Sequence, residues 1–371
     1  MYSNDPRTVI TLDAGGTNLA FGAIKGNKYI VEPLVLPSNA ENLDICLNTM
    51  VEGFSRIISQ LDEKPVAISF AFPGPADYPN GIIGGYLPNF PSFRDGVALG
   101  PFLEEKFGIP VFINNDADLY AYGEALGGAL PELNQKLAES NSNKQFRNLL
   151  AFTFGTGFGF GFVTDGELHI GDNSCVETFC QRHKHMPNVM VEEGVSIRAI
   201  KRVYAEESGS TDITLTPKDI FDIAEGKRAG DQEAAKKAFA TLGEVAGDAM
   251  ATAVTFIDGV IVIGGGLSAA AKYIKPALLN EMRSKIHTLQ GGLLNRVQMK
   301  VYDLDNEAEF EEFAKGESRT IKVYGSEREV SYDPQKRIGV MFSKIGANTA
   351  TSIGAYAFAL NKIDKTAEAT K

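Results

Sequence analysis

The same local pattern occurs twice in this chain, once near the start and once in the middle. Residues 9–12 form a short apolar run that ends in Asp13 and a glycine-rich stretch, after which apolar and polar residues alternate. Residues 149–154 form a second apolar run, which ends in a Gly-Thr-Gly turn at 155–157 and is again followed by alternation. Each copy predicts a strand, a glycine-rich turn and a second strand. This repeat favours two α/β halves built on one plan.

Length and charge narrow the classes of function. The 371 residues suffice for two domains with separate cores. A net charge of −11 disfavours a nucleic-acid partner. An odd cysteine count, three, argues against a disulfide framework and for a reducing compartment. Because the chain shows neither a secretory signal nor an apolar run near the roughly 18 residues of a membrane span, we expect a cytoplasmic protein without a membrane partner.

The periodicity of apolar residues places the other elements. Helical spacing predicts helices over 40–61, 98–107, 232–256, 268–287 and 349–360. Strands are predicted at 28–35, 66–72, 110–113 and 259–264. Three further stretches stand out: a long Gly- and Pro-rich connection at 76–97, a linker-like stretch at 134–147, and an insertion at 289–345 with a charged helical segment and hairpins. An α/β protein is therefore expected.

Three glycine clusters follow predicted strands, at 15–18, 155–157 and 264–266. Glycines leave backbone N–H groups open to phosphate oxygens, although each cluster alone also fits a tight turn. Together they favour a nucleotide. None has the spacing of a P-loop or of a Rossmann dinucleotide site, so both of those folds are disfavoured.

Two aspartates lie where phosphoryl transfer needs carboxylates. Asp116 follows the strand at 110–113 and opens a helix, a position that also suits a helix cap. Phosphoryl transfer needs positioning, charge neutralisation by Mg²⁺ and a carboxylate that accepts the proton of the attacking hydroxyl. Asp116 suits the base, and Asp13 suits Mg²⁺, bound through water because this ion dehydrates reluctantly.

A set of motifs extends these observations to most of the chain. In order, they are DAGGTN at 13–18, PGP at 73–75, LPNF at 87–90, NNDAD at 114–118, GTGFGFG at 155–161 and VIVIGGGLS at 260–268. This series resembles the ROK family of sugar kinases and repressors. The resemblance implies the actin-like ATPase (ribonuclease H-like) fold, with two duplicated α/β domains around a cleft. The smaller domain would comprise 1–118 and a C-terminal helix at about 349–371, and the larger 119–348.

The resemblance also implies which residues bind ATP and the sugar. The phosphate and adenosine contacts would come from Asp13, Gly15, Gly16, Thr17, Asn18, Gly155, Thr156, Gly157, Gly264, Gly265 and Gly266. The sugar would contact Gly74, Asn89, Asn115, Asp116, Glu177 and Glu192, with Glu193 as the alternative to Glu192. Asp116 would be the general base. Two carboxylates can hold a polyol because each oxygen accepts a hydroxyl proton.

The chain departs from the family pattern in the same region. Many members carry a cysteine-rich zinc run, which is replaced here by HKHMPNVMV at 183–191. A structural zinc is therefore not expected, although Cys175, Cys180, His183 and His185 lie close enough in sequence to ligate a metal with other spacing. Cys180 stands in the place of the family's sugar-binding histidine. Asp118 replaces a common asparagine, either as a helix cap, which we favour, or as a charge that raises the pKa of Asp116.

The expected function is an ATP-dependent hexose kinase of glucokinase or fructokinase type that acts at O6. Two alternatives remain: a sugar-responsive regulator and a non-catalytic sugar-binding relative. The family's repressors carry a DNA-binding segment before the first phosphate strand, which this chain reaches at Val9, so we expect none. A homodimer is expected because the family is often dimeric. The sequence leaves open which sugar is used.

Overall fold

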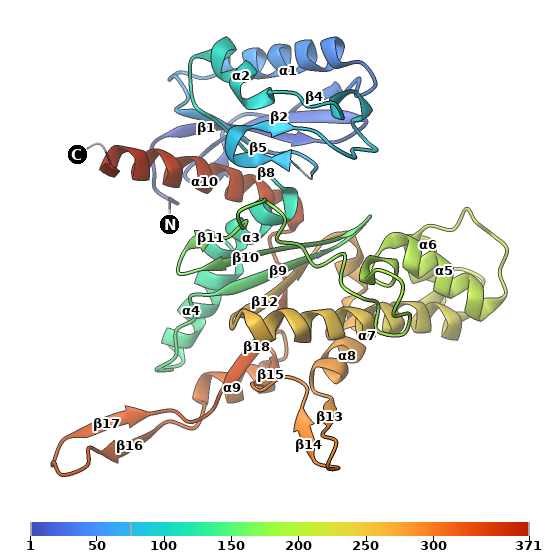
Figure 1. Ribbon diagram of the computed structural model, residues 1–371, viewed down its shortest axis with the longest axis vertical. Coiled ribbons are helices and arrows are strands. Elements are labelled where there is room, and N and C mark those ends of the chain that lie inside the picture. The colour runs from blue at the N-terminus through green and yellow to red at the C-terminus, as the bar shows by residue number, and fades with distance from the viewer. Residues whose placement is uncertain (1, 75, 370–371) are drawn as a thin grey trace. The chain divides into compact units, whose positions relative to one another are not determined.

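The computed structural model describes residues 2–74 and 76–369, so Pro75 of the PGP motif lies outside the described residues. The chain forms two compact units (Figure 1). Unit 1 comprises Met1–Ala129, Gly161–Val176 and Ile345–Lys371, and unit 2 comprises Leu130–Phe160 and Glu177–Lys344. The division expected from the sequence, with its boundary at residue 118, stays a prediction.

The sheet of unit 1 brings three strand ends to one edge. Its strands are β1 (Thr8–Ala14), β2 (Asn18–Lys25), β3 (Lys28–Tyr29), β4 (Leu34–Pro37), β5 (Ala67–Ala71) and β8 (Val111–Asn114). The order is β3-β2-β1-β5-β8, with β4 also paired to β2, and β1, β5 and β8 are parallel. Asp13 is the register partner of Ala71, and Ala71 is the partner of Asn114. The carboxyl ends of parallel strands form the edge at which α/β sheets bind ligands.

Helices lie on both faces of this sheet (Figure 1): α1 (Leu43–Ile58) and α2 (Leu99–Phe107) cover one face and α10 (Ala347–Ala369) covers the other. Helix α3 (Asp116–Leu126) packs against α10. The helix α1 begins at its cap Asn42 and buries Met50, Phe54 and Ile57 at helical spacing. Helices α3 and α10 approach so closely that a Cβ at Gly123 would lie 1.8 Å from the carbonyl oxygen of Ala350. A side chain there would push the two helices apart.

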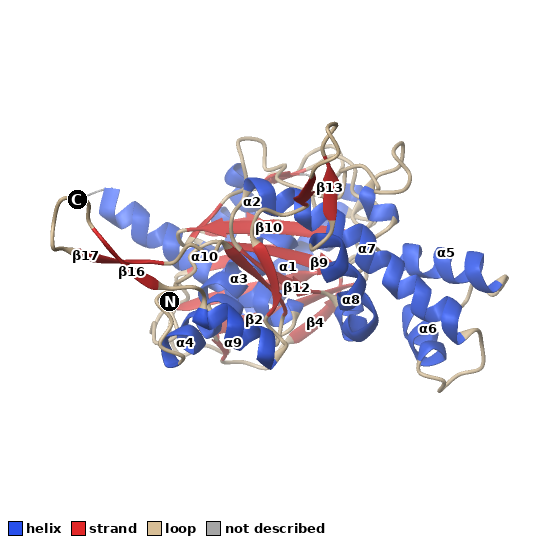
Figure 2. Cartoon of the chain, turned by 90° about the horizontal axis from the view of Figure 1, so that it is seen from below, coloured by secondary structure: helices blue, strands red, loops and turns tan. Residues whose placement is uncertain are grey.

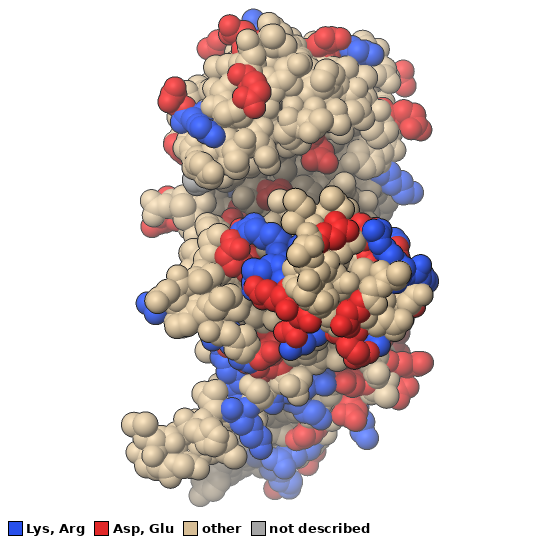
Figure 3. Space-filling model, turned by 90° about the vertical axis from the view of Figure 1, so that its right-hand side faces the viewer, with Lys and Arg blue, Asp and Glu red and all other residues tan. Residues whose placement is uncertain are grey.

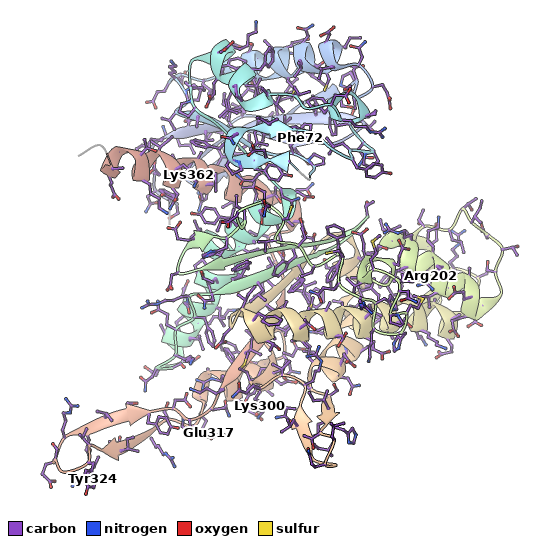
Figure 4. All side chains as sticks on the ribbon, in the orientation of Figure 1. Phe72, Arg202, Lys300, Glu317, Tyr324 and Lys362 are labelled. Atoms are coloured by element: carbon purple, nitrogen blue, oxygen red, sulfur yellow. The ribbon has the colours of Figure 1, made fainter. Side chains whose placement is uncertain are left out.

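The long connection at 76–97 packs against the core of unit 1. It contains β6 (Ala76–Asp77), η1 (Tyr78–Asn80), β7 (Ile82–Ile83) and η2 (Pro91–Phe93). Its Phe90 and Phe93 lie against Phe72, with ring centroids 4.6 and 5.2 Å from that of Phe72, which is labelled in Figure 4. Aromatic packing of this kind fixes a segment that has little regular structure.

The second sheet repeats the plan of the first. Its strands are β9 (Leu149–Phe154), β10 (Phe158–Thr164), β11 (Glu167–Leu168), β12 (Val260–Gly264), β15 (Lys300–Asp303) and β18 (Arg337–Phe342). Their order is β11-β10-β9-β12-β18-β15, and β9, β12, β18 and β15 are parallel. In both sheets, therefore, a strand pair joined by a glycine turn continues into parallel strands. The predicted repeat is confirmed.

The helices of unit 2 are α4 (Ala129–Glu139), which begins at the last residue of unit 1, α5 (Ile197–Ser208), α6 (Pro217–Ala224), α7 (Gln232–Phe256), α8 (Ala271–Met282) and α9 (Glu307–Lys315), with η3 (Val191–Glu193) and η4 (Gly266–Ala270). Helices α7 and α8 are in close contact because Gly243 and Gly247 have no side chains. A Cβ at Gly243 would lie 2.2 Å from the carbonyl oxygen of Ile274. The predicted bounds of α7 are those observed.

Several predicted elements differ from the structure, among them the last helix, which is expected over 349–360 and runs from Ala347 to Ala369. The helix expected over 268–287 ends at Met282, and 285–287 forms β13, which pairs with β14 (Leu293–Asn295) across a turn where Gly291 has a φ of +82°. The strand expected over 28–35 is split into β3 and β4 around Pro33, which lacks the N–H that a central strand donates. The linker-like stretch at 134–147 begins inside α4.

The stretch at 289–345, expected as one insertion, contains two strands of the second sheet, β15 and β18, so it is not inserted as a whole. Outside these strands it holds the predicted charged helix, α9, and a predicted hairpin, β16 (Arg319–Lys322) with β17 (Glu329–Tyr332). Figure 2 shows this hairpin extending away from the rest of unit 2, and its tip residue Tyr324 is labelled in Figure 4.

Among the described residues, none of the helices has the length and apolar character needed to cross a bilayer.

Candidate active site

In unit 1, the end of β8 carries Asn115 and Asp116. Asn115 is the N-cap of α3, and its side-chain oxygen accepts a hydrogen bond from the N–H of Ala117 at 2.8 Å. One oxygen of Asp116 accepts from the same N–H at 2.9 Å. Asn115 therefore serves as the cap of α3, and the solvent-accessible carboxylate of Asp116 keeps acceptor capacity for another role.

The electrostatics of this edge favour a proton acceptor. Desolvation by surrounding protein atoms raises the pKa of Asp116, the backbone N–H groups of Ala117 and Asp116 partly oppose the shift, and the charge of Asp13 adds to it. Desolvation also raises the pKa of Asp13, although its side chain is accessible to solvent. A general base works best when its pKa lies closer to the working pH than that of an ordinary aspartate.

Asp118 differs from the expectation. The sequence favours Asp118 as a helix cap, but the cap is Asn115, and Asp118 is 6% exposed, with its Oδ1 lacking a hydrogen-bond partner in the described structure. Burial, followed by the charge of Asp116, raises the pKa of Asp118 to about 8. Burial thus favours the neutral form of this carboxyl group in the folded protein.

The first glycine turn links β1 to β2. The N–H of Gly15 donates to the carbonyl of Asn18 at 2.9 Å, which closes the turn. The buried Ser38 supports it: its N–H donates to the carbonyl of Thr17 at 2.9 Å, and its hydroxyl donates to the carbonyl of Gly16. Sequence reasoning missed Ser38, because a lone serine after a strand carries no signal of this role.

The structure places Asn89 against this turn. A Cβ at Gly16 would lie 2.9 Å from the Cβ of Asn89, so only glycine allows this approach. A Cβ at Gly74 would lie 2.5 Å from the hydroxyl of the buried Tyr78, which donates to the carbonyl of Phe72 at 2.8 Å. Asp13, the turn at 15–18, Asn89, Asn115 and Asp116 are thus contributed by neighbouring parts of unit 1.

In unit 2, the second and third glycine clusters lie together. The N–H of Gly155 donates to the carbonyl of Gly157 at 3.1 Å, and Gly264 is the register partner of Thr153. Gly265 has a φ of +88°, and a Cβ there would lie 2.3 Å from the carbonyl oxygen of Phe154. By contrast, a Cβ at Gly155 or Gly266 would meet nothing within 4 Å. The backbone at these two glycines is open to a ligand.

Glu192 reaches the second glycine turn. Its Oε2 accepts from the N–H of Phe158 at 3.0 Å, and its Oε1 accepts from Nη2 of Arg198 at 2.7 Å. A Cβ at Gly157 would lie 2.6 Å from Oε2, so this glycine makes room for the carboxylate. Glu193 accepts from Nε of Arg198 at 2.8 Å. Sequence reasoning missed Arg198.

The segment of Glu177 runs beside that of Glu192. The N–H of Glu192 donates to the carbonyl of Phe179 at 3.4 Å, and the N–H of Val191 donates to that of Gln181 at 2.7 Å. Glu177 itself is partly buried, two residues before this pairing begins. The backbone therefore brings the two predicted sugar carboxylates onto adjacent stretches of chain.

Ion pairs hold this segment to the helices of unit 2. The Lys184 Nζ lies 2.5 Å from both Glu244 of α7 and Glu281 of α8, and Nε2 of His185 lies 3.2 Å from Glu244. His183 is buried, which lowers its pKa. Cys175 and Cys180 are exposed free thiols. In the part of the chain that the structure describes, no group of three His, Cys, Asp or Glu side chains could hold a metal ion.

Comparison with known proteins agrees with these motifs. The model of the ROK family matches residues 9–300. A glucokinase from Thermotoga maritima is 27% identical over 302 residues, which cover 75% of this chain and 86% of that protein.

Comparison with solved structures identifies the fold. A glucokinase structure from Parabacteroides distasonis is 60% identical, with a TM-score of 0.90 over 97% of this chain and 99% of that chain. A ROK glucokinase from Streptomyces griseus, solved with glucose and AMPPNP, is 16% identical with a TM-score of 0.61 over 94% of this chain and 98% of that one. The two sheets with their glycine turns are those of the actin-like ATPase fold. With the family model matching most of its length, this chain belongs to the ROK family.

Proposed function

We propose that this protein is an ATP-dependent sugar kinase that phosphorylates a hexose, with glucose as the first candidate substrate and O6 as the acceptor. The observation that carries the proposal is Asp116, an accessible carboxylate of raised pKa at the strand edge beside the first glycine turn. The 60% identity to a glucokinase over nearly the whole chain supports the class of substrate.

The reaction requires one proton acceptor and a cradle for phosphates. The O6 hydroxyl attacks the γ-phosphorus of ATP, the bond to the β,γ-bridging oxygen breaks, ADP leaves, and Asp116 accepts the hydroxyl proton. Backbone N–H groups of the glycine turns at 15–18 and 155–157 hold phosphate oxygens, and the open backbone at Gly266 suits the adenosine side. Positioning of this kind is most of what phosphoryl transfer asks of a protein.

Asp13 is the residue suited to hold Mg²⁺. Its accessible carboxylate is an oxygen ligand, and the absence of a three-residue metal cluster among the described residues fits an ion that is bound mostly by phosphates and water. When bound, Mg²⁺ neutralises charge on the phosphates.

The sugar contacts would come from both carboxylates and amides. Each oxygen of Glu192 already accepts one hydrogen bond from the protein, which leaves each oxygen one acceptor site for a sugar hydroxyl. The amide nitrogen of Asn115 remains available because the helix cap uses only its oxygen. We assign further contacts to Asn89, Gly74 and Glu177, as the family resemblance implies.

The test is a coupled ADP-release assay with MgATP against glucose, fructose, mannose and N-acetylglucosamine. Asp116→Asn should lower kcat by about 100-fold or more for the preferred sugar, because an amide cannot accept the proton. Asp44→Asn, an exposed aspartate in the first turn of α1, is the matched control and should retain wild-type turnover. The 6-deoxy form of the preferred sugar should bind without turnover if O6 is the acceptor.

The outcomes separate the alternatives. Wild-type protein that shows no turnover with any sugar overturns the kinase proposal. If sugar or ATP still raises its melting temperature, the sugar-responsive regulator or non-catalytic relative is the better description. Turnover that survives in Asp116→Asn retains the kinase but rejects Asp116 as its base.

A further inference from the structure

Arg198 joins three parts of the candidate site in unit 2. It lies in the first turn of α5, where its Nη2 donates to Glu192 at 2.7 Å and its Nε donates to Glu193 at 2.8 Å. Its Nη1 makes a longer contact of 3.4 Å with the carbonyl of Thr156 in the second glycine turn. One guanidinium thus contacts a proposed sugar carboxylate, the carboxylate next to it and the turn assigned to phosphate.

The local charge indicates what Arg198 does. A cation beside a phosphate turn suggests an anion-binding role, but two carboxylates already pair with this one guanidinium. The three groups together carry one excess negative charge, so they do not attract a phosphate. The role of the Arg198 cation is therefore to hold the carboxylates of Glu192 and Glu193.

The planar guanidinium of Arg198 fixes the orientation of the two carboxylates that it binds. Two nitrogens in one rigid plane bind two different carboxylates, an arrangement that the single ammonium of lysine cannot reproduce. Glu192 is held at both oxygens, by Arg198 on one side and the N–H of Phe158 on the other. Without Arg198 only the Phe158 contact remains, and the carboxylate can turn away from it.

The next turn of α5 reinforces the arrangement. Arg202, labelled in Figure 4, donates to the backbone carbonyl of Glu193 at 3.1 Å. The helix thus holds the side chains of the η3 turn through Arg198 and its backbone through Arg202. In Figure 3, the face of unit 2 that carries α5 and α6 shows basic and acidic side chains intermixed, which fits paired arginines rather than a basic patch.

We propose that Arg198 is a positioning residue for sugar binding, which aligns the carboxylate of Glu192 with the second glycine turn. The inference rests on the proposed function, because it needs a sugar that Glu192 binds. Loss of the Arg198 side chain should weaken sugar binding while leaving the binding of MgATP nearly unchanged.

The experiment measures KM for the sugar and for MgATP separately in Arg198→Gln, Arg198→Lys and a control. Arg198→Gln should raise the sugar KM about tenfold and change the MgATP KM less than about twofold. Arg198→Lys restores the charge but not the fork and should give an intermediate sugar KM. Lys201→Gln removes a cation from the same helix whose contact is the carbonyl of Ile213, and it should behave as wild type.

A double-mutant cycle with Glu192→Gln tests whether Arg198 acts through Glu192. If Arg198 acts through Glu192, Arg198→Gln should add less than about twofold to the sugar KM of Glu192→Gln, because the aligned group is already gone. Additive effects, or equal changes in both KM values, overturn the inference. If Arg198→Gln fails to fold, Arg198→Lys, which keeps the charge and most of the stem, carries the same cycle.

Failure of this inference is distinct from failure of the proposed function. Wild-type protein without sugar turnover rejects the function. Wild-type turnover together with an unchanged sugar KM in both Arg198 variants rejects only the role of Arg198.

Discussion

Asp13 lies near the end of β1 and Asp116 lies just after β8, two strands whose register is fixed by a sheet. By contrast, Glu177 and Glu192 lie in the stretch from 169 to 196, between β11 and α5, whose one regular element is the short η3 turn. We call the first set, with the glycine turns at 15–18 and 264–266, the strand-end part. The second set, with the chain from 169 to 196, is the loop part. Both hold candidate site residues in place, but by different means.

The two parts differ in which atoms fix the positions of the candidate site residues. In the strand-end part, backbone hydrogen bonds set positions, and close backbone approaches at Gly16 and Gly265 tighten them. In the loop part, side chains make the contacts: Lys184 reaches out to α7 and α8, and Arg198 reaches in from α5. Substitutions that disturb the backbone should therefore damage the strand-end part most. Substitutions of charged side chains should damage the loop part.

The largest effect should come from Gly265→Ala. The new Cβ would meet the carbonyl oxygen of Phe154 at 2.3 Å in a residue whose φ is +88°, and neither strand end can retreat without breaking the sheet. We expect the free energy of unfolding to fall by roughly 3 kcal/mol or more. Denaturant unfolding of the purified variant measures it.

Its control is the next residue. A Cβ at Gly266 meets nothing within 4 Å, so Gly266→Ala should keep the wild-type free energy of unfolding to within about 0.5 kcal/mol. Its effect should instead fall on the KM for MgATP, because the backbone there is proposed to face the nucleotide. Equal stability loss in both variants would show that the close approach at Gly265 is not the cause.

The second effect concerns pH and the strand-end part. Burial, then the charge of Asp116, raises the pKa of Asp118 to about 8, whereas in the unfolded chain it is about 3.9. Between these values the folded state binds the extra proton, so stability should fall as pH rises from 4 to 8. Asp118→Asn lacks this titration and should be roughly 2 kcal/mol more stable than wild type at pH 8.

Urea unfolding at pH 5 and pH 8 checks this expectation. The advantage of Asp118→Asn should grow between the two pH values, while Asp44→Asn, on the exposed face of α1, should follow the wild type at both. A constant difference between Asp118→Asn and wild type would mean that Asp118 is already ionised at pH 5.

The strand-end part was largely predictable from the sequence, because its signals are local. An apolar run that ends in glycines marks a strand and its turn, and the bounds of β9 and α7 come out as predicted. Where the local signal was ambiguous, prediction failed. Residues 285–287 continue an apolar spacing that fits a helix, but they pair as a strand with 293–295.

The loop part could not be predicted because its contacts join distant residues. Lys184 binds partners 60 and 97 residues further along the chain, and Arg198 contacts a carbonyl 42 residues before it. No spacing in the sequence signals such contacts. The resemblance to the family pointed to Glu192 but not to the arginine that holds it.

The third effect tests the ion pairs of the loop part. Lys184→Gln leaves the carboxylate of the buried Glu281 without its cation, so we expect the free energy of unfolding to fall by about 1 kcal/mol and the sugar KM to rise. Lys237 lies on α7, the helix that also carries Glu244, and forms a more exposed ion pair with Glu207. Lys237→Gln breaks that pair and should change neither the free energy of unfolding nor the sugar KM. Matching results for the two variants would mean that Lys184 does not anchor the loop part.

The smallest expected effect is that of removing metal ions. In relatives with a cysteine-rich zinc run, a chelator would be expected to loosen the corresponding loop, since a structural zinc contributes directly to folding. Here the corresponding stretch is tied down by Lys184 and His185, and the described residues contain no cluster that could hold a metal. Treatment with EDTA and a zinc-selective chelator should therefore change the melting temperature by less than about 1 °C. A clear drop, reversed by zinc but not by magnesium, would mean that metal rather than ion pairs holds the loop part, and the effect of Lys184→Gln would then need another cause.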